Sequence, residues 1–238
     1  HPRDSEAVED TTDAIIIRNI WNDKDYGKPE PWYKRWRSKP TLPIHDDLYI
    51  REGDYYSGSG ESKDYLVWLY KNGFPVIPSV SHIRDLGELP DTDTYFIKPQ
   101  DGFDGINSRK LSRAELMELS PEHYIIEPFI DFEHEISFYY LDKQLQYTLH
   151  APDRTKRWDL IEFTPSDADL EFAETFIQWN KQRRGIERID ACRLKNGKLL
   201  LMEVTDQGGA YLSVLDLPET TQQKFLENLS ASIKKNCL

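Results

Sequence analysis

Two carboxylates lie near the margins of the stretch RIDACRLKNGKLLLMEVTDQGG (188–209), and their placement suggests chemistry. Asp190 lies early in the first of two apolar segments, Glu203 ends the second, and Asp206 follows closely. If the segments pair as a hairpin, like charges on adjacent strands repel each other unless something positive lies between them. A metal ion is one explanation, and exposed surface acids are the other.

A lysine beside a glycine-bearing loop is the second candidate. Lys98 closes the apolar stretch TYFIKP (94–99), and the loop that follows contains Gly102 and Gly105. Such a loop lets the backbone approach a polyphosphate and offers N–H donors to it, although the pattern GxxxxGK[ST] is absent. The alternative is a lysine that ends an edge strand before an ordinary hairpin.

A third candidate is the apolar stretch IIEPFI (125–130), which is interrupted only by Glu127 and followed by Glu135. A flat apolar crossover can hold an adenine ring, while a carboxylate beyond it accepts ribose hydroxyls. A strand-to-strand connection with solvated acids is the alternative. Lys63 opens a helical pattern over 62–73 and, taken alone, is expected to be a solvated surface lysine.

The elements that must position these residues mix helices with antiparallel strands, which predicts an α+β fold. Apolar spacing and capping predict helices over 62–73, 112–119, 166–182 and 219–235, with Gly73 ending the first and Ser112 and Glu115 forming a capping box. Apolar runs and alternation predict strands over 14–18, 94–99, 106–111, 123–130, 134–141 and 144–151, followed by the hairpin. Residues 22–61 show little regular pattern.

Composition narrows the class of protein. The formal net charge of −12 argues against DNA or RNA as the main partner. Two cysteines suggest neither a disulfide framework nor a zinc site, and no apolar run approaches membrane-spanning length. We therefore expect a soluble, cytoplasmic protein without a membrane partner, and a homodimer stays open. Because the chain begins with His1 rather than Met, we expect its N-terminal α/β domain to be short or incomplete.

Taken in order, the helix lysine, the strand lysine with its glycine loop, IIEPFI, the following glutamate and the RID–MEV pair resemble the ATP-grasp superfamily. The similarity is greatest to D-alanine–D-alanine ligase and the glutathione-synthetase-like carboxylate–amine ligases, and it covers roughly residues 61–217. It implies an ATP-grasp fold in which two α+β subdomains grip ATP. The implied division is a pre-ATP-grasp-like region over 1–60, a small lid subdomain over 61–130 and a large subdomain with the metal site over 131–238.

The resemblance also implies roles for individual residues. It implies that Lys63 and Lys98 bind the ATP phosphates beneath the loop with Gly102 and Gly105, and that Glu135 binds the ribose. The backbone of a linker would bind the adenine; the linker residues are Glu127, Pro128, Phe129 and Ile130. Asp190 and Glu203 match two metal-binding acids, and Arg188 matches an arginine that faces the reacting carboxylate. The resemblance implies that Arg188 and Lys98 are the catalytic residues. The third metal position, usually asparagine, is Thr205 here, and Asp206 could replace it as a ligand.

The implied function is an ATP- and Mg²⁺-dependent carboxylate–amine ligase that works through an acyl phosphate, with Mn²⁺ as a possible substitute metal. Its substrates would be an amino acid, peptide or similar small acid and an amine acceptor. Arg18, Arg154 and Arg157 are candidate contacts to the substrate. The alternative is a non-catalytic ATP-binding module of the same fold, acting as a sensor or scaffold, which Thr205 and the short N-terminal region favour.

Overall fold

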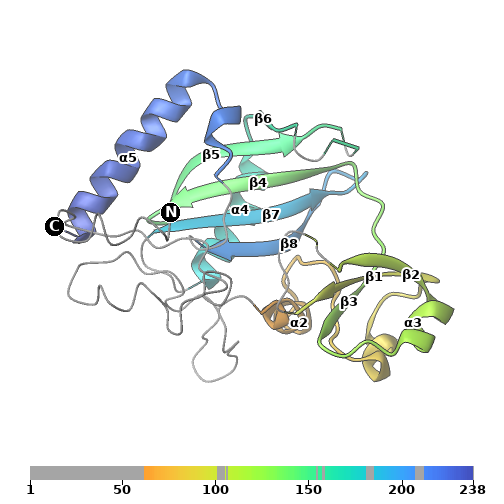
Figure 1. Cartoon of the computed structure of the whole chain (residues 1–238). Coiled ribbons are helices and arrows are strands. Elements are labelled where there is room, and N and C mark those ends of the chain that lie inside the picture. Colours follow the sequence, from red (N-terminus) through yellow and green to blue (C-terminus); the bar gives the residue numbers. More distant parts are fainter. Residues whose placement is uncertain are drawn as a thin grey trace, which may run out of the picture.

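The computed structural model describes residues 62–100, 105, 107–153, 155–156, 159–180, 185–206 and 212–237. They form two lobes, each built on an antiparallel sheet (Figure 1). The small sheet has the order β2-β1-β3, with β1 Thr94–Pro99, β2 Arg109–Ser112 and β3 Tyr124–Pro128. The large sheet has the order β6-β5-β4-β7-β8, with β4 His134–Leu141, β5 Gln144–Ala151, β6 Ile161–Glu162, β7 Ile186–Arg193 and β8 Leu199–Asp206.

The described helices are α2 Asp64–Lys71, α3 Arg113–Leu119, α4 Asp167–Trp179 and α5 Glu219–Cys237, with 3₁₀ turns η5 Ile83–Glu88 and η6 Val214–Asp216. Two of them, α3 and α4, begin where side chains satisfy the first backbone N–H groups. The predicted capping box of Ser112 and Glu115 is confirmed, and Ser166 forms a second one with Asp169 at the start of α4. Gly73 follows α2 with a left-handed φ of 77°, as expected for a helix stop.

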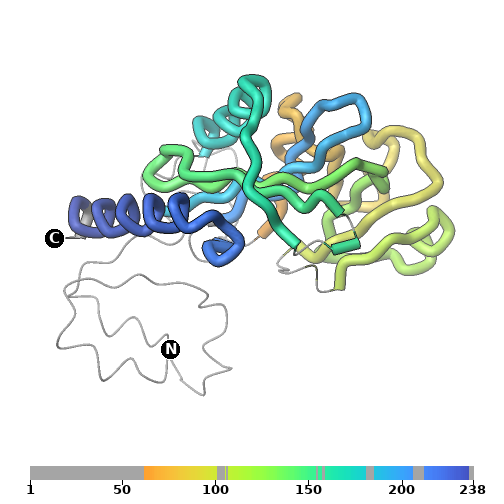
Figure 2. The backbone as a smooth tube through the Cα atoms, turned by 90° about the horizontal axis from the view of Figure 1, so that it is seen from above, coloured from red at the N-terminus to blue at the C-terminus, as the bar shows by residue number. Residues whose placement is uncertain are grey.

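Alternation along β4 assigns the two faces of the large sheet. Ile136, Phe138 and Tyr140 belong to a core with α2 and α4, whereas Tyr139 and Leu141 pack in a second core with η6 and α5. Figure 2 shows α4 and α5 on opposite sides of this sheet. The residues of β4 that share the α5 face, Glu135 and Ser137, lie at the end of the strand nearer the small lobe.

Helix α2 differs from its expected grouping. The sequence places it with the lid over 61–130, but Tyr65, Leu66 and Leu69 are fully buried in the core of the large sheet. A separate core fills the small lobe, and its buried members are Val80, Leu86, Leu89, Tyr95, Ile97, Leu116 and Ile126. The chain therefore passes from one core to the other between Val76 and Val80.

The remaining elements agree with the sequence to within a few residues. The strand expected over 106–111 occupies Arg109–Ser112, the helix expected over 166–182 ends at Trp179, and the short strand β6 was not predicted. The strand expected over 14–18 lies outside the described residues, as does the region 22–61. The α+β class with antiparallel sheets is confirmed. Among the described helices, none has both the length and the apolar composition needed to cross a bilayer.

Two histidines on the α4 face predict a pH-dependent stability. The rings of His134 and His150 meet edge to face with centroids 5.2 Å apart, and burial lowers the pKa of both below the ordinary value of 6.5. Arg193 lowers the pKa of His134 further, while Glu133 and Asp169 oppose it; His134 itself lowers that of His150. The unfolded chain therefore binds more protons below pH 6.5.

We expect the free energy of unfolding to fall as the pH drops below 6.5 and to level off above it. Urea denaturation at a series of pH values measures this dependence. His150→Gln should weaken it, because one of the two groups that take up protons on unfolding is then removed. An identical slope in the variant and the wild type would show that other groups cause the dependence.

Candidate functional site

Charged residues from distant parts of the chain meet where the two lobes join. Lys63, at the start of α2, lies with its Nζ 3.1 Å from Oε1 of Glu203 on β8. Lys98, on β1, lies with its Nζ 2.7 Å from Oε1 of Glu127 on β3 and donates to the backbone carbonyl of Met202 at 3.2 Å. The structure thus brings both predicted phosphate lysines to the edge of β8. We call the region around Lys63, Lys98 and Glu203 the lysine seam.

The pair of Lys98 and Glu127 is buried. Their side chains are only 12% and 4% exposed, and the hydroxyl of Ser79 lies 3.2 Å from Oε1 of Glu127. The alternative expectations, a solvated Glu127 and an ordinary edge-strand lysine at position 98, are therefore wrong. Two charges removed from water require good geometry and hydrogen bonds to be tolerated, which Ser79 and the Met202 carbonyl help to supply. Ser79 was not identified from sequence.

Lys63 is also not the solvated lysine that its local sequence suggests. Its side chain is 8% exposed, while that of Glu203 is 37% exposed. Burial alone would raise the pKa of the Glu203 carboxyl, but the charges of Lys63 and Lys98 hold it below its ordinary value. Glu203 is therefore ionised at neutral pH, as a metal ligand must be.

Asp190 lies directly across from Glu203 in the register of β7 and β8, just before a β-bulge. Arg188 grips both of its oxygens, with Nε and Nη2 at distances of 2.8 to 2.9 Å, and Ser137 donates to Oδ1 at 2.6 Å. Asp190 in turn raises the pKa of the guanidinium, against the lowering effect of burial. Repulsion between the two acids is thus offset by two cations, Arg188 for Asp190 and Lys63 for Glu203.

Ser137 was missed by the sequence reasoning, although a signal exists. It lies two residues after Glu135 on an alternating strand, so the two side chains share the face that carries the site. Its register partner across β4 and β7 is Asp190 itself. The register is a long-range property, and the local pattern marks only the face.

Magnesium fits the acids of this site. Mg²⁺ is usually held by one or two carboxylates together with substrate phosphates, so Asp190 and Glu203 suffice in number. The hydroxyl oxygen of Thr205 is buried and has no hydrogen-bond partner among the described residues, and Thr205 pairs with Arg188 across the strands. It is an unused oxygen on the same face as Glu203. The side chain of Asp206 lies outside the described residues, so its proposed role as a ligand stays a prediction.

In the linker predicted to bind adenine, part of the backbone already makes hydrogen bonds within the small sheet. Its first two residues, Glu127 and Pro128, end β3, and the N–H of Phe129 donates to the carbonyl of Thr94 at 2.9 Å. The ammonium of Lys110 lies 3.7 Å from the centre of the Phe129 ring. Since proline has no N–H, the donor left in the last three residues is that of Ile130.

Other predicted residues fall at the margins of the description. Gly105 has a left-handed φ of 68°, a conformation that glycine adopts without strain. Gly102 and the three candidate substrate arginines, Arg18, Arg154 and Arg157, lie outside the described residues. Glu135 is half-buried on the site face and pairs in register with Cys192 and Ala151. Cys192 is buried, which raises the pKa of its thiol to about 12 and makes it unreactive.

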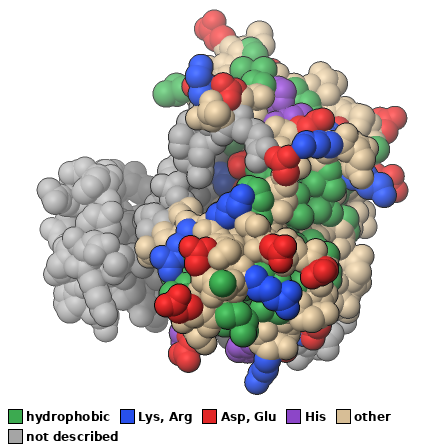
Figure 3. Space-filling view, turned by 90° about the vertical axis from the view of Figure 1, so that its right-hand side faces the viewer, with side chains coloured by type: hydrophobic (Ala, Val, Ile, Leu, Met, Phe, Trp, Pro, Cys, Tyr) green, Lys and Arg blue, Asp and Glu red, His purple; other side chains and the backbone are tan. Residues whose placement is uncertain are grey.

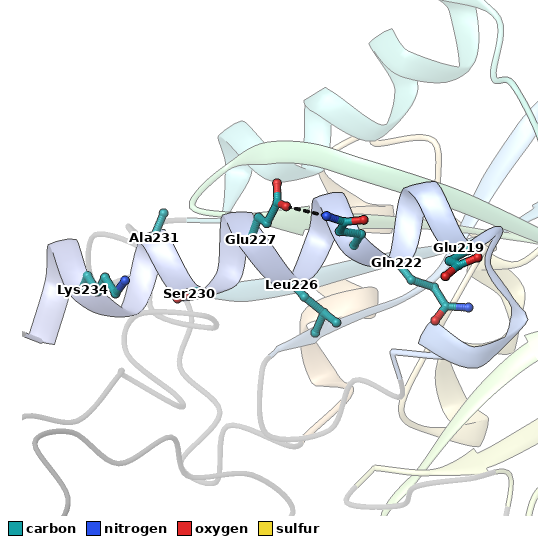
Figure 4. A pocket seen from close by; sticks show the side chains of 8 residues that line it. Glu219, Gln222, Leu226, Glu227, Ser230, Ala231 and Lys234 are labelled. Atoms are coloured by element: carbon teal, nitrogen blue, oxygen red, sulfur yellow. Dashed lines mark hydrogen bonds between the residues drawn. The ribbon is translucent and has the colours of Figure 1, made fainter.

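A hollow along the outer face of α5 is separate from the lysine seam (Figure 4). The described residues that line it all belong to this one helix, and they are mostly polar, such as Gln222, Glu227 and Lys234. On the face that Figure 3 shows, the described residues mix acidic and basic side chains.

No family model matches the sequence, and no curated protein of related sequence was found. Solved structures, in contrast, share the fold. D-cycloserine synthetase DcsG aligns over 93% of this chain and 85% of its own, with a TM-score of 0.64 and 15% identity. D-alanine–D-alanine ligase from Bacillus anthracis, complexed with ATP, aligns over 99% and 84%, with a TM-score of 0.63 and 14% identity.

A third similar structure is the ATP-grasp ligase PsnB, complexed with a phosphomimetic variant of its minimal precursor, Mg and ADP. It aligns over 92% of this chain and 76% of its own, with a TM-score of 0.60 and 14% identity. Likeness at such low identity establishes the fold. The chain has the ATP-grasp fold, and the resemblance predicted from its sequence is confirmed at that level.

Proposed function

We propose that this protein is an ATP- and Mg²⁺-dependent ligase that joins a small carboxylic acid, such as an amino acid or peptide, to an amine. The observation that carries the proposal is the lysine seam: two lysines and two metal-type acids from four elements converge at the junction of the lobes. D-alanine–D-alanine ligase and PsnB, which share the fold, are ligases seen with ATP or with Mg and ADP.

In this proposal each residue of the seam has a defined task. Lys63 and Lys98 exchange their acid partners for phosphate oxygens, since an ammonium stabilises charge on the transferring phosphoryl group. Glu203 and Asp190 hold Mg²⁺, which neutralises the triphosphate and orients it. Arg188 orients the acid whose oxygen attacks the γ-phosphate, giving an acyl phosphate and ADP. The amine then attacks the acyl carbon and releases phosphate.

The contacts of Arg188 explain how it is oriented before the substrate binds. Its side chain is 16% exposed, and its guanidinium bonds Asp190 through two nitrogens. Arg188 is therefore held in one orientation before any ligand arrives, which lowers the entropic cost of binding a carboxylate. The pair Arg188 and Asp190 supplies preorganisation, and Ser137 fixes the acid from its other side.

The test is ADP release in the presence of Mg-ATP and a panel of amino acids, short peptides and small acids, with amines added as acceptors. We expect ADP formation that depends on both the acid and Mg²⁺. The matched control omits Mg²⁺ or the acid. Tight binding of ATP without turnover on any member of a broad panel would contradict the ligase and leave a non-catalytic nucleotide-binding module.

A further inference from the structure

The two lysines of the seam belong to different lobes. Lys63 precedes α2, which packs in the core of the large sheet, whereas Lys98 lies on β1 of the small sheet. The separation of their two ammonium groups is therefore not set by either lobe alone. It depends on the contacts between the lobes, which include the bond from Lys98 to the carbonyl of Met202 on β8 and the contacts that hold the end of β1 against the start of α2.

Among the described residues, Gln100 makes contacts of the second kind. Its N–H donates to the carbonyl of His123 at 2.9 Å, which fixes it to the small lobe. Its carbonyl accepts from the N–H of Lys63 at 2.8 Å, and its side-chain Nε2 donates to Oδ1 of Asp64 at 2.6 Å. Gln100 thus ties the strand that carries Lys98 directly to the residue that carries the other ammonium group.

Asp64, which accepts the side-chain bond from Gln100, is itself held in place. Asp64 opens α2, and the hydroxyl of Ser62 donates to its second oxygen, Oδ2, at 3.0 Å. The hydrogen bond from Gln100 ends on a carboxylate oxygen, and charge-assisted bonds of this kind are stronger than neutral ones. In sequence Gln100 also immediately precedes the glycine-bearing stretch 101–105. The contact therefore lies at the base of both phosphate-binding features.

We propose that Gln100 and Asp64 are positioning residues of the phosphate site. Their hydrogen bond sets the relation between Lys63 and Lys98, and through it the affinity for the β- and γ-phosphates. The inference rests on the proposed function only in requiring that the seam binds a nucleotide. Neither side chain needs to touch the ligand.

The experiment compares the affinities of adenosine, AMP, ADP and Mg-ATP for the wild type and for Gln100→Ala and Gln100→Glu, by calorimetry or competition. The second variant puts a carboxylate next to that of Asp64. We expect ADP and Mg-ATP to bind about tenfold more weakly, the effect of losing about 1.4 kcal/mol of charge-assisted bonding. Adenosine and AMP should change by less than about twofold, because their binding does not require both lysines.

A double substitution, Gln100→Glu with Asp64→Asn, reverses donor and acceptor and should recover most of the lost ADP affinity. Gln178→Ala is the matched control, since the side-chain amide of Gln178 also donates to a carboxylate, that of Glu174, but lies on α4, away from the seam. Thermal unfolding of each variant checks that it folds. Equal weakening of all four ligands, or a double variant no better than Gln100→Glu, would show a merely structural role and overturn the inference.

The two proposals fail in different ways. If the wild type binds Mg-ATP no more tightly than adenosine, the nucleotide site itself is wrong and the positioning role falls with it. If the wild type shows a strong preference for the phosphorylated ligands and both Gln100 variants keep it, the proposed function stands and the positioning role is wrong. Selective loss in the variants, with recovery in the double variant, supports both.

Discussion

Lys98→Met is expected to lose nucleotide-dependent activity and to destabilise the fold at once. Loss of a charge-stabilising donor at the transferring group should lower turnover by about 10²–10³-fold. The substitution also leaves the carboxylate of Glu127, 4% exposed, without its cation. Removing one partner of a buried ion pair typically costs about 3–5 kcal/mol. Turnover is measured as ADP release, and stability by chemical denaturation.

A second variant separates these two effects. Lys98→Met combined with Glu127→Gln removes the orphaned charge, so stability should largely return while turnover stays low. Lys195→Met is the matched control: its ion pair with Asp131 is exposed, and such pairs contribute about 1 kcal/mol or less. If the double variant regained turnover together with stability, Lys98 would be a structural residue and not a ligand of the phosphates.

Glu203→Gln is expected to uncouple the nucleotide from the metal. In the free protein the carboxylate pairs with Lys63, and in the proposed loaded state it would hold Mg²⁺, so its removal should lower turnover by about 10²–10³-fold. Binding of metal-free ADP should instead be kept or rise by up to about fivefold, because the acid that competes with the phosphates for Lys63 is then absent. The ratio of ADP affinities with and without Mg²⁺ reports this directly.

The control for this variant is Glu162→Gln, which removes an exposed acid on β6 of the same sheet. We expect its ADP affinity and Mg²⁺ dependence to match the wild type. A Glu203→Gln protein whose ADP affinity still responds to Mg²⁺ like the wild type would place the metal elsewhere, with Asp206 as the first candidate. Weaker binding of metal-free ADP would argue that Lys63 does not hold the phosphates.

Partial neutralisation of the seam has a thermodynamic consequence for ligand binding. In the free protein each lysine already has an acid partner, Glu203 for Lys63 and Glu127 for Lys98. In the proposed complex a nucleotide would replace these ion pairs, and its net gain would be the difference between the two interactions. The partly exposed pair of Lys63 and Glu203 is cheaper to open than the buried pair of Lys98 and Glu127, so Lys63 is the lysine whose partner exchange we expect first.

Local elements of the fold were predictable from sequence because their causes are local. The capping box of Ser112 and Glu115, the stop at Gly73 and the alternation along 134–141 each depend on residues within one turn or one strand. The order of lysines, glycine loop and acids along the chain was sufficient to predict the ATP-grasp fold, which the structural similarities confirm.

What each charged side chain contacts was decided only by the tertiary structure. Taken alone, Lys63 resembled a surface lysine and Glu127 a solvated acid, yet both are buried, because α2 packs on the large sheet and β3 pairs with β1. The hairpin and the resemblance pair Asp190 and Glu203 as candidate metal ligands, whereas the clamp by Arg188 and Ser137 depends on strand register. Burial and register are set by long-range packing, whereas patterning and capping are written in neighbouring residues.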